Sequence, residues 1–292
     1  KELEPGLNAL FGLEYDRYEN EAAEIFESEG SDRAFEEEVM LSGFGTAPVK
    51  SEGSAINFDD AQETYTARYT METIALAFSI TEEAVEDNLY DRLAARYTRA
   101  LARSMAQTKQ IKGATVLNNA FSTASPIGDG AALCSAAHPS LSGNQSNLLA
   151  TPADLNETSL EDILIQIAGF TDERGLKIAV RGTKLLIPKE LQFIAERIIN
   201  SNLRPGSADN DINAMKSMGM LPEGAVVNHF FTDADAYFVK TDCPNGFKLF
   251  NRTPLKTAME GDFDTGNMRF KARERYAFGV SDWRCVFGTP GA

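Results

Sequence analysis

The chain has 292 residues, of which 43% are hydrophobic, and its formal net charge is −15 at pH 7. This length and apolar content allow one large domain or two with a substantial core. The negative charge disfavours a protein that grips nucleic acid directly, because phosphate neutralisation requires a basic surface. No apolar run approaches the ~20 residues of a membrane helix, and the N-terminus lacks the apolar core of a signal peptide, so neither membrane insertion nor secretion is expected. The three cysteines cannot all pair, which is typical of a reducing compartment.

The first 44 residues are predicted to form an N-terminal arm. Residues 1–40 contain 13 acidic and 3 basic side chains, which account for −10 of the net charge. A solvated acidic arm is one interpretation, but large apolar side chains recur here more often than in disordered segments. We therefore expect the arm to dock on another surface.

Residues 45–75 are predicted to form an extended β-hairpin that projects from the body of the chain. Its first half contains Gly, Pro and Ser residues that favour turns, and a long strand pattern follows in Thr64–Ile80. The apolar positions of this strand change from odd to even numbers, which indicates a bulge or bend near Glu72 and Thr73. Because an isolated hairpin is only marginally stable in water, the hairpin and the arm together indicate obligate assembly.

The segment Thr81–Lys112 is predicted to be a long helix that extends to about Asn119. Thr81 is a candidate N-cap, and no Gly or Pro interrupts the segment before Gly113. At 1.5 Å per residue it would extend roughly 48 Å, which suits the spine of an elongated, flattened domain. Its large apolar side chains recur at every fourth residue, so their stripe drifts around the helix and different neighbours must cover its two ends. They are Val85, Leu89, Leu93, Tyr97, Leu101 and Met105.

A second unit of helices and strands is predicted from Asp154 onward. A helix is expected within Asp154–Gly175, a buried strand at Lys184–Ile187 and a second helix from Pro188. The expected core residues are Leu160, Ile163, Leu164, Ile167 and Phe170 in the first helix and Leu191, Ile194, Ala195 and Ile198 in the second. The segment Leu203–Gly224 is a long loop of the kind that makes functional contacts. Strands are expected at Ala225–Phe231, Ala236–Val239 and Phe247–Phe250.

The C-terminal segment returns to a strand pattern. Apolar and charged residues alternate from Met268, and the same phase continues to Val280. A turn at Asp262–Asn267 precedes this strand, and a final short strand is expected at Asp282–Phe287. With the long helix as cover, these strands predict an α+β layer in which one helix lies on one sheet.

No motif in the chain requires catalysis, and no cofactor or metal is expected. The sequence contains no GxGxxG, GxxxxGK[ST], GxSxG or HExxH pattern. His138 follows Cys134 by four residues without a further ligand nearby, so a structural role is expected. His229 lies in an apolar strand pattern and is expected to be a core or interface residue. Asp209 and Asp211 are similar to the start of a calcium loop, but the required Gly and the closing acid are absent.

Five short segments follow one another along the chain, and their order and spacing can be compared with those of known protein families. They are LNNAF at Leu117–Phe121, DGAAL…HP…G…N from Asp129 to Asn147, DERG at Asp172–Gly175, LLIPKEL at Leu185–Leu191 and FKARERYAFGVSDW at Phe270–Trp283. Together with the arm, the hairpin and the long helix, this succession resembles the major capsid proteins of tailed bacteriophages, which have the Hong Kong 97 fold. The resemblance spans nearly the whole chain and depends on the order of the segments.

The resemblance implies an α+β fold with four parts: an N-terminal arm (1–44), an E-loop hairpin (45–75), a peripheral domain (76–154 and 252–292) with a spine helix at 81–119, and an axial domain (155–251). It also implies assembly as hexamers and pentamers into an icosahedral head that encloses double-stranded DNA. The protein would be made in the cytoplasm of a bacterial host and reside in the virion. Portal, scaffolding and decoration proteins would be further partners, with no membrane involved.

The resemblance also implies which residues make contacts. Contacts between subunits would come from Lys50, Phe58, Tyr65, Arg68 and Tyr69 of the E-loop and from Phe11, Tyr15, Tyr18 and Phe26 of the arm. The loop at the capsomer centre would present Arg204, Asp209, Asp211 and Lys216, and the turn toward neighbouring capsomers would present Asp262, Asp264 and Asn267. Some members of the family join subunits through an isopeptide bond between lysine and asparagine. Lys50, the only lysine of the hairpin, and Asn267 are then the candidate pair.

Three other functions remain open on the sequence. The nearest is an encapsulin-type cellular shell of the same fold. Enzyme cargo that co-purifies with the shell in place of DNA would indicate it. An α/β enzyme with an unrecognised site would use Asp209, Asp211 and His229, and stabilisation of a monomer by substrate would indicate it. An adhesive or tail structural protein would form rings or tubes.

Overall fold

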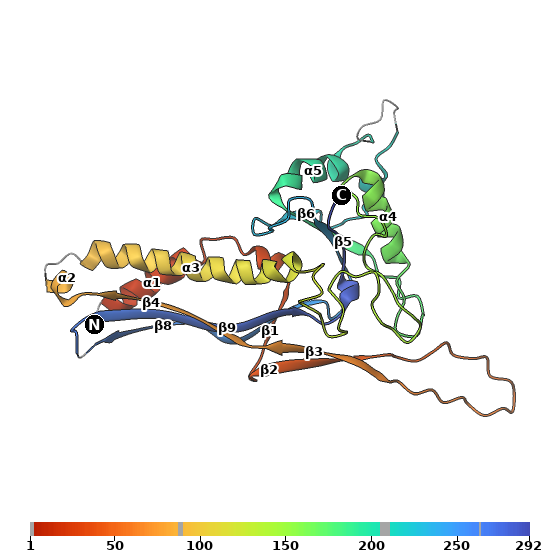
Figure 1. Cartoon of the computed structure of the whole chain (residues 1–292), viewed down its shortest axis with the longest axis horizontal. Coiled ribbons are helices and arrows are strands. Elements are labelled where there is room, and N and C mark those ends of the chain that lie inside the picture. Colours follow the sequence, from red (N-terminus) through yellow and green to blue (C-terminus); the bar gives the residue numbers. More distant parts are fainter. Residues whose placement is uncertain (1–2, 87–89, 205–210, 263) are drawn as a thin grey trace. The chain divides into compact units, whose positions relative to one another are not determined.

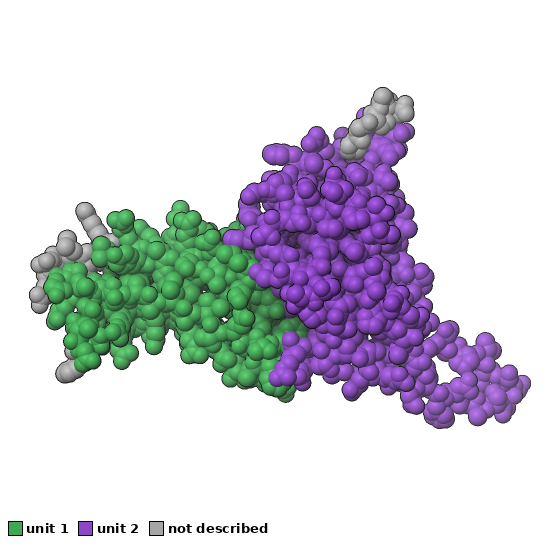
Figure 2. Space-filling model, in the orientation of Figure 1, with its two compact units in different colours: residues 1–36, 69–113, 249–278 green, residues 37–68, 114–248, 279–292 purple. Residues whose placement is uncertain are grey.

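The computed structural model describes residues 3–86, 90–204, 211–262 and 264–292. The chain divides into two compact units (Figure 2): unit 1 contains residues 1–36, 69–113 and 249–278, and unit 2 contains residues 37–68, 114–248 and 279–292. Both units combine helices with a four-stranded sheet (Figure 1). The predicted α+β class is confirmed.

Unit 1 is built on a sheet with the strand order β1-β8-β9-β4. Figure 1 shows helices α1 and α3 on the same face of this sheet. Its elements are α1 (Leu3–Tyr15), the 3-10 helix η1 (Glu21–Glu24), β1 (Glu27–Gly30), β4 (Glu72–Ile80), α2 (Glu82–Glu86), α3 (Tyr90–Asn118), β8 (Phe247–Gly261) and β9 (Met268–Val280); α3, β8 and β9 continue into unit 2. The core between helices and sheet contains Phe11 of α1, Met105 of α3 and Phe270 of β9. The prediction of one helix on this sheet is incomplete, because α1 covers it as well.

The predicted spine is present as α2 and α3, with residues 87–89 outside the described part of the chain. Thr81 Oγ1 accepts a hydrogen bond from the Ala84 N–H at 3.4 Å, which agrees with its prediction as an N-cap. The predicted apolar stripe is only partly right. Leu101 and Met105 are buried but Tyr97 is 43% exposed, and the side chains of Val85 and Leu89 lie outside the described residues.

The buried face of α3 uses small side chains that the sequence prediction did not count. Ala94, Thr98, Leu101 and Met105 are all at most 4% exposed, and their spacing of four, three and four residues is that of one face of a regular helix. Small residues on this face let the neighbouring elements approach closely. The prediction that the apolar stripe drifts around the helix is therefore wrong, because it considered the large apolar residues alone.

The N-terminal arm folds on its own chain over residues 3–26. Phe11 is 2% exposed and packs near Tyr15 and Phe270, with ring centroids 6.1 and 6.4 Å apart. Phe26 is 4% exposed, and its ring meets that of Phe278 at 4.8 Å. The expectation that this segment needs a neighbouring subunit as its docking surface is wrong here, because unit 1 already covers its large apolar residues.

The predicted bend in the long strand is confirmed at Met71. This residue separates β3 (Glu63–Thr70) from β4, which pairs with β9. The partner of β3 is β2 (Phe35–Leu41), in a two-stranded sheet of its own. The hairpin thus begins within the segment that the sequence assigned to the arm.

Unit 2 contains a mixed sheet with the strand order β10-β7-β5-β6. Its elements are α4 (Glu157–Ala168), β5 (Gly182–Ile187), η2 (Lys189–Leu191), α5 (Gln192–Asn200), α6 (Ala214–Met218), β6 (Ala225–Val227), β7 (Tyr237–Thr241), η3 (Trp283–Cys285) and β10 (Val286–Thr289). Strand β5 runs parallel to β6 and antiparallel to β7.

Most of the predicted core of unit 2 is confirmed. All five residues expected in the core from the first helix segment, the last of them Phe170, are buried, as are Leu191, Ala195 and Ile198. Ile194 is an exception at 36% exposure. The strand predicted at Ala225–Phe231 ends at Val227, and His229 beyond it is exposed, so His229 is not a core residue.

Candidate assembly surfaces

The segment between β2 and β3, residues 42–62, exposes large apolar side chains. We call it the hairpin loop; it extends away from the rest of unit 2 (Figure 2). Val49, Ile56 and Phe58 are 99%, 70% and 97% exposed, and Leu41 at the end of β2 is 58% exposed. Exposed apolar groups gathered in one segment are typical of a contact surface.

Hydrogen bonds close the base of the hairpin loop. The Ser42 N–H donates to Gln62 O at 2.8 Å, and the Gln62 N–H donates to Ser42 Oγ at 2.9 Å. Further along, the Gly45 N–H donates to Asp59 Oδ2 at 2.7 Å. These bonds hold the two ends of the loop together while the side chains at its tip stay uncovered.

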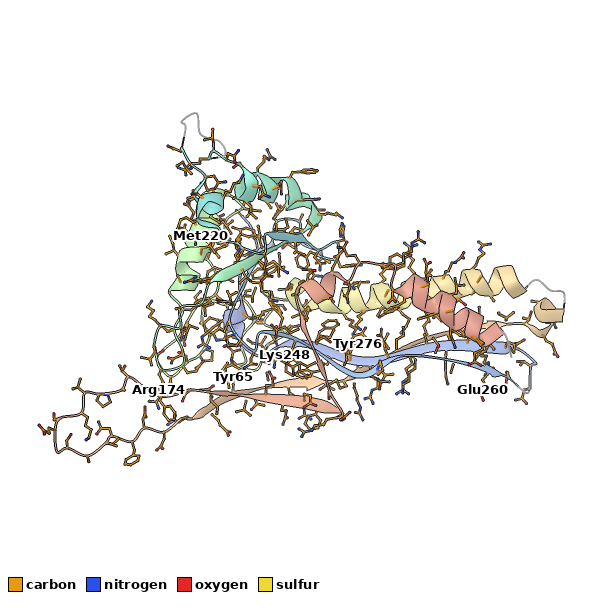
Figure 3. All side chains as sticks on the ribbon, turned by 180° about the vertical axis from the view of Figure 1, so that it is seen from behind. Tyr65, Arg174, Met220, Lys248, Glu260 and Tyr276 are labelled. Atoms are coloured by element: carbon orange, nitrogen blue, oxygen red, sulfur yellow. The ribbon has the colours of Figure 1, made fainter. Side chains whose placement is uncertain are left out.

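Arg174 clamps the loop from another part of unit 2 (Figure 3). Its Nη2 donates to Asp59 Oδ1 at 3.1 Å and to Asp60 O at 2.7 Å. The Gly45 N–H and then the Arg174 guanidinium hold the pKa of Asp59 below its ordinary value, because both stabilise the carboxylate. Sequence reasoning missed this clamp, since 115 residues separate Asp59 and Arg174 and neither belongs to a motif.

The root of the hairpin is held by a buried charge pair. Glu38 of β2 forms a short ion pair with Lys248 of β8 and accepts a hydrogen bond from the Ser281 hydroxyl. The Lys248 side chain is 5% exposed (Figure 3). This pair anchors the strands of the hairpin in unit 2, and Arg174 holds the loop at Asp59 and Asp60.

The predicted E-loop contact residues divide into exposed and covered ones. Lys50 and Phe58 are exposed, and Arg68 is an exposed residue paired with Glu37 at 3.5 Å. Tyr65 is half-buried and donates its hydroxyl hydrogen bond to Ser281 O at 3.2 Å; burial raises its pKa well above the ordinary range. Tyr69 is 4% exposed, so its assignment as an accessible contact is wrong.

The predicted contact residues of the arm divide in the same way. Phe11 and Phe26 are buried in unit 1, so their assignment as contacts free for a neighbour is wrong. Tyr15 is half-buried and donates to Glu274 Oε2 at 3.5 Å. Tyr18 is 39% exposed and stays a candidate contact.

The predicted capsomer-centre loop is tied to unit 2 at both sides of its undescribed part. Arg204 Nε pairs with Glu157 Oε2 at 2.9 Å, and the Arg204 N–H donates to Asp211 O at 3.0 Å. Lys216 Nζ donates to Asn200 O at 2.8 Å. Asp211 is exposed, and Asp209 lies outside the described residues. The cations at this loop thus hold its ends in place.

The turn at Asp262–Asn267 joins β8 to β9 as predicted. The Asp262 N–H donates to Asn267 O at 2.8 Å, and the Asp262 carboxylate pairs with Arg269 at 2.5 Å. Asp262 therefore stabilises the turn itself. Asp264 is exposed and Asn267 is half-buried, and their predicted role toward neighbouring capsomers stays a prediction.

The segment from Asp129 to Asn147 forms a buried polar cluster. His138 has no exposed surface; its Nδ1 lies 2.6 Å from Asp129 Oδ2 and its Nε2 lies 3.0 Å from Asn147 Oδ1. Its ring stacks on Trp283 at 4.4 Å. The Asn147 amide donates to Leu133 O and to two carbonyls of the C-terminal segment. The structural role predicted for His138 is confirmed.

A metal site and a membrane-spanning helix each have requirements that can be compared with the described residues. In residues 3–86, 90–204, 211–262 and 264–292 there is no group of three or more His, Cys, Asp or Glu that could hold a metal ion. Within the same ranges, no helix combines the length and apolar character that a bilayer crossing requires. Of the residues proposed for an enzyme site, His229 is exposed and Asp209 is not described.

Residues 64–288 match the model of a family described as "Phage capsid protein". The chain belongs to this family. Similar solved structures include the virus-like particle from Pyrococcus furiosus, with a TM-score of 0.57 and 8% identity over 99% of this chain and 100% of that chain. The capsid of Myoviridae phage XM1 and that of a native gene transfer agent particle each have a TM-score of 0.54 and 12% identity, over 92% of this chain and 89% of theirs. The comparison with curated proteins finds no match.

The fold of this phage capsid protein is thus the Hong Kong 97-like fold that the sequence predicted. A capsid protein of this type self-assembles into a shell and is located in that shell.

Proposed function

We propose that this capsid protein assembles as hexamers and pentamers into the icosahedral head of a tailed bacteriophage, which encloses double-stranded DNA. We further propose that it is made in the cytoplasm of the bacterial host and acts with portal, scaffolding and decoration proteins. Its role is structural, without enzymatic activity.

The hairpin loop is the observation that carries the proposal. Val49 and Phe58 are 99% and 97% exposed in a loop whose base is closed by hydrogen bonds. Burial of a large apolar side chain contributes about 1.5–3 kcal/mol, so one loop per subunit provides a considerable driving force when copies cover one another. The family match gives the shell as the form of that assembly.

Cryo-electron microscopy of particles made from the full chain tests the proposal. The expected particles have fivefold and sixfold capsomers with the hairpin loop lying on an adjacent subunit. Nuclease treatment before DNA extraction should leave protected double-stranded DNA in particles from infected cells. Open tubes or rings, or a hairpin loop facing solvent in the particle, would contradict the proposal.

An encapsulin-type shell is the second candidate. Its support is the similarity to the virus-like particle from Pyrococcus furiosus, which covers 99% of this chain. Particles of this kind would contain a protein cargo in place of DNA. Mass spectrometry of purified particles separates the candidates, because a stoichiometric second protein with no nucleic acid would favour the cellular shell.

We keep a covalent link between subunits as a further proposal. The exposed Lys50 amine of one copy would attack the side-chain carbonyl of Asn267 of another, forming an isopeptide bond and releasing ammonia. Denaturing electrophoresis of mature particles tests this, because linked subunits would migrate as ladders and unlinked ones as a single monomer band.

A further inference from the structure

A polar groove lies between the end of α1 and the outer face of α3 in unit 1. It is a shallow, open groove of about 330 Å³, lined by Glu14 and Tyr18 from the N-terminal segment and by Arg99, Arg103, Ser104 and Gln107 from α3. Ala100 is the one apolar residue among its lining side chains in the described part of the chain. The groove is unlike the apolar hairpin loop and suits a charged, hydrogen-bonding ligand.

Three arginines on α3 form a basic stripe along this groove. Arg96, Arg99 and Arg103 are exposed and follow one another at three and four residues, which places them on one side of the helix. No carboxylate of the described residues forms an ion pair with any of them. By contrast, Lys109 and Lys112 further along α3 pair with Glu274 at 3.6 Å and with Glu72 at 2.6 Å. Within the described part of the chain, the positive charge of this stripe is therefore not neutralised by an ion pair.

The carboxylate at the rim of the groove is already engaged. Glu14 Oε1 accepts a hydrogen bond from the Tyr18 hydroxyl at 3.3 Å and pairs with Arg17 at 3.6 Å. The Arg103 guanidinium lies 6.0 Å from the centre of the Tyr18 ring, within reach of a weak cation–π attraction. Arg17, whose side chain is 72% exposed, is the cation that this carboxylate pairs with, so we do not count it in the stripe.

We propose that this stripe of Arg96, Arg99 and Arg103 binds the phosphate backbone of the enclosed double-stranded DNA. The proposal rests on the proposed function and names a contact that the shell makes with its contents. Arginine forks match phosphate oxygens in geometry and charge. Neighbouring arginines of the stripe rise by about 4.5 and 6 Å along the helix axis, so the three cations form an extended row, and an extended polyanion such as a duplex can contact all of them.

The composition of the groove favours a nucleic acid over a protein segment. Protein interfaces have an apolar centre, whereas nucleic-acid interfaces are more polar and more positive. The net charge of −15 over the whole chain limits the attraction to this stripe. The contact is thus weak and reversible at each subunit and independent of base sequence. In the shell, this face of α3 must point toward the enclosed volume.

Fluorescence anisotropy with a labelled 20-base-pair duplex tests the proposal on the full chain. The test variant is Arg99→Gln with Arg103→Gln. Its control is Arg33→Gln with Arg197→Gln, which removes the same charge from exposed arginines outside the groove. Thermal melting of each variant verifies that the fold is retained.

The salt dependence gives the expected result. With three phosphate contacts, an increase from 50 to 200 mM salt should weaken wild-type and control binding about 40-fold, and with one remaining contact the test variant should lose only about 3- to 4-fold. Equal slopes for the test and control variants would overturn the proposal. So would wild-type protein that ignores the duplex but binds a polyglutamate peptide through the same arginines, since the groove would then hold an acidic protein segment.

The outcome also separates this inference from the proposed function. Electron micrographs of the same samples report whether shells form. Shells that form normally while the arginine variant binds DNA like the control would reject the groove and leave the capsid function standing. Failure of every sample to form shells would reject the function, whatever the DNA binding shows.

Discussion

Replacement of Phe58 by serine should weaken assembly without unfolding the subunit. Phe58 is 97% exposed in the hairpin loop, so its ring contributes little to the stability of the isolated chain. Exposed substitutions of this kind change the free energy of unfolding by no more than about 0.5 kcal/mol. The same ring becomes a buried contact if the loop lies on an adjacent subunit.

The size of the effect follows from the area that the contact would cover. Full burial of a phenylalanine side chain contributes about 1.5–3 kcal/mol, and each 1.4 kcal/mol is a tenfold change in an association constant. Since each subunit gives one hairpin loop to a neighbour, Phe58→Ser should raise the concentration required for assembly roughly 10- to 150-fold. Phe58→Leu, which keeps most of the apolar area, should assemble close to normally.

Light scattering as a function of protein concentration measures this threshold, and urea denaturation of the unassembled protein measures folding. The expected pair of results is a raised threshold and an unchanged urea midpoint. A serine variant that assembles at the wild-type concentration would refute the role of the loop. A variant with a lowered urea midpoint would show that Phe58 serves the fold of the subunit instead.

Three further predictions concern the fold that supports the assembly surfaces. Phe11→Ala should lower the free energy of unfolding by about 3–5 kcal/mol in urea titrations, because the ring fills the core beneath α1 and would leave a cavity; a loss under 1 kcal/mol would mean that the arm is not docked. Arg284→Met should cost about 3–5 kcal/mol, because it leaves Glu173 buried at 2% exposure without its 2.7 Å partner; a melting temperature equal to wild type would contradict this. Burial raises the pKa of Glu274 above its ordinary value of 4.5, against the opposing effect of Lys109. The folded chain therefore binds this proton more tightly than the unfolded chain does. The stability from Glu274 should be fully present below pH 4.5 and decline as the pH rises through the folded pKa, and Glu274→Gln should remove that decline from thermal melts.

The parts of the fold that were predictable from the sequence are those with a strong local pattern. The alternation of apolar and charged residues from Met268 to Val280 predicted β9 and its core face. The helical spacing of Leu160, Ile163 and Ile167 gave the core side of α4. Such patterns report which face of an element is apolar, and burial follows from that.

The docking of the arm was not predictable from the same kind of pattern. Leu7 and Phe11 show that α1 has an apolar face, but a pattern does not say whether a neighbouring subunit or the same chain covers it. In this structure α3 and β9 of the same chain cover it. The arm therefore no longer indicates obligate assembly. Of the two features that the sequence offered for it, only the hairpin remains.

Contacts between residues distant in sequence explain the rest of what was missed. His138 and Asn147 lie within ten residues of each other, but their stacking and bonding partners in the C-terminal segment follow about 140 residues later. The pairing of Arg174 with Asp59 spans a similar separation. Such pairs leave no periodic signal in a single sequence, so only the folded structure identifies them.

Negative-stain electron microscopy of the purified full chain, over a range of protein concentrations, tests the central claim most directly. The account predicts closed, uniform shells above a threshold concentration and free capsomers below it. A protein that remains monomeric at every concentration, with the hairpin loop exposed to solvent, would contradict the claim that this chain is the subunit of a shell.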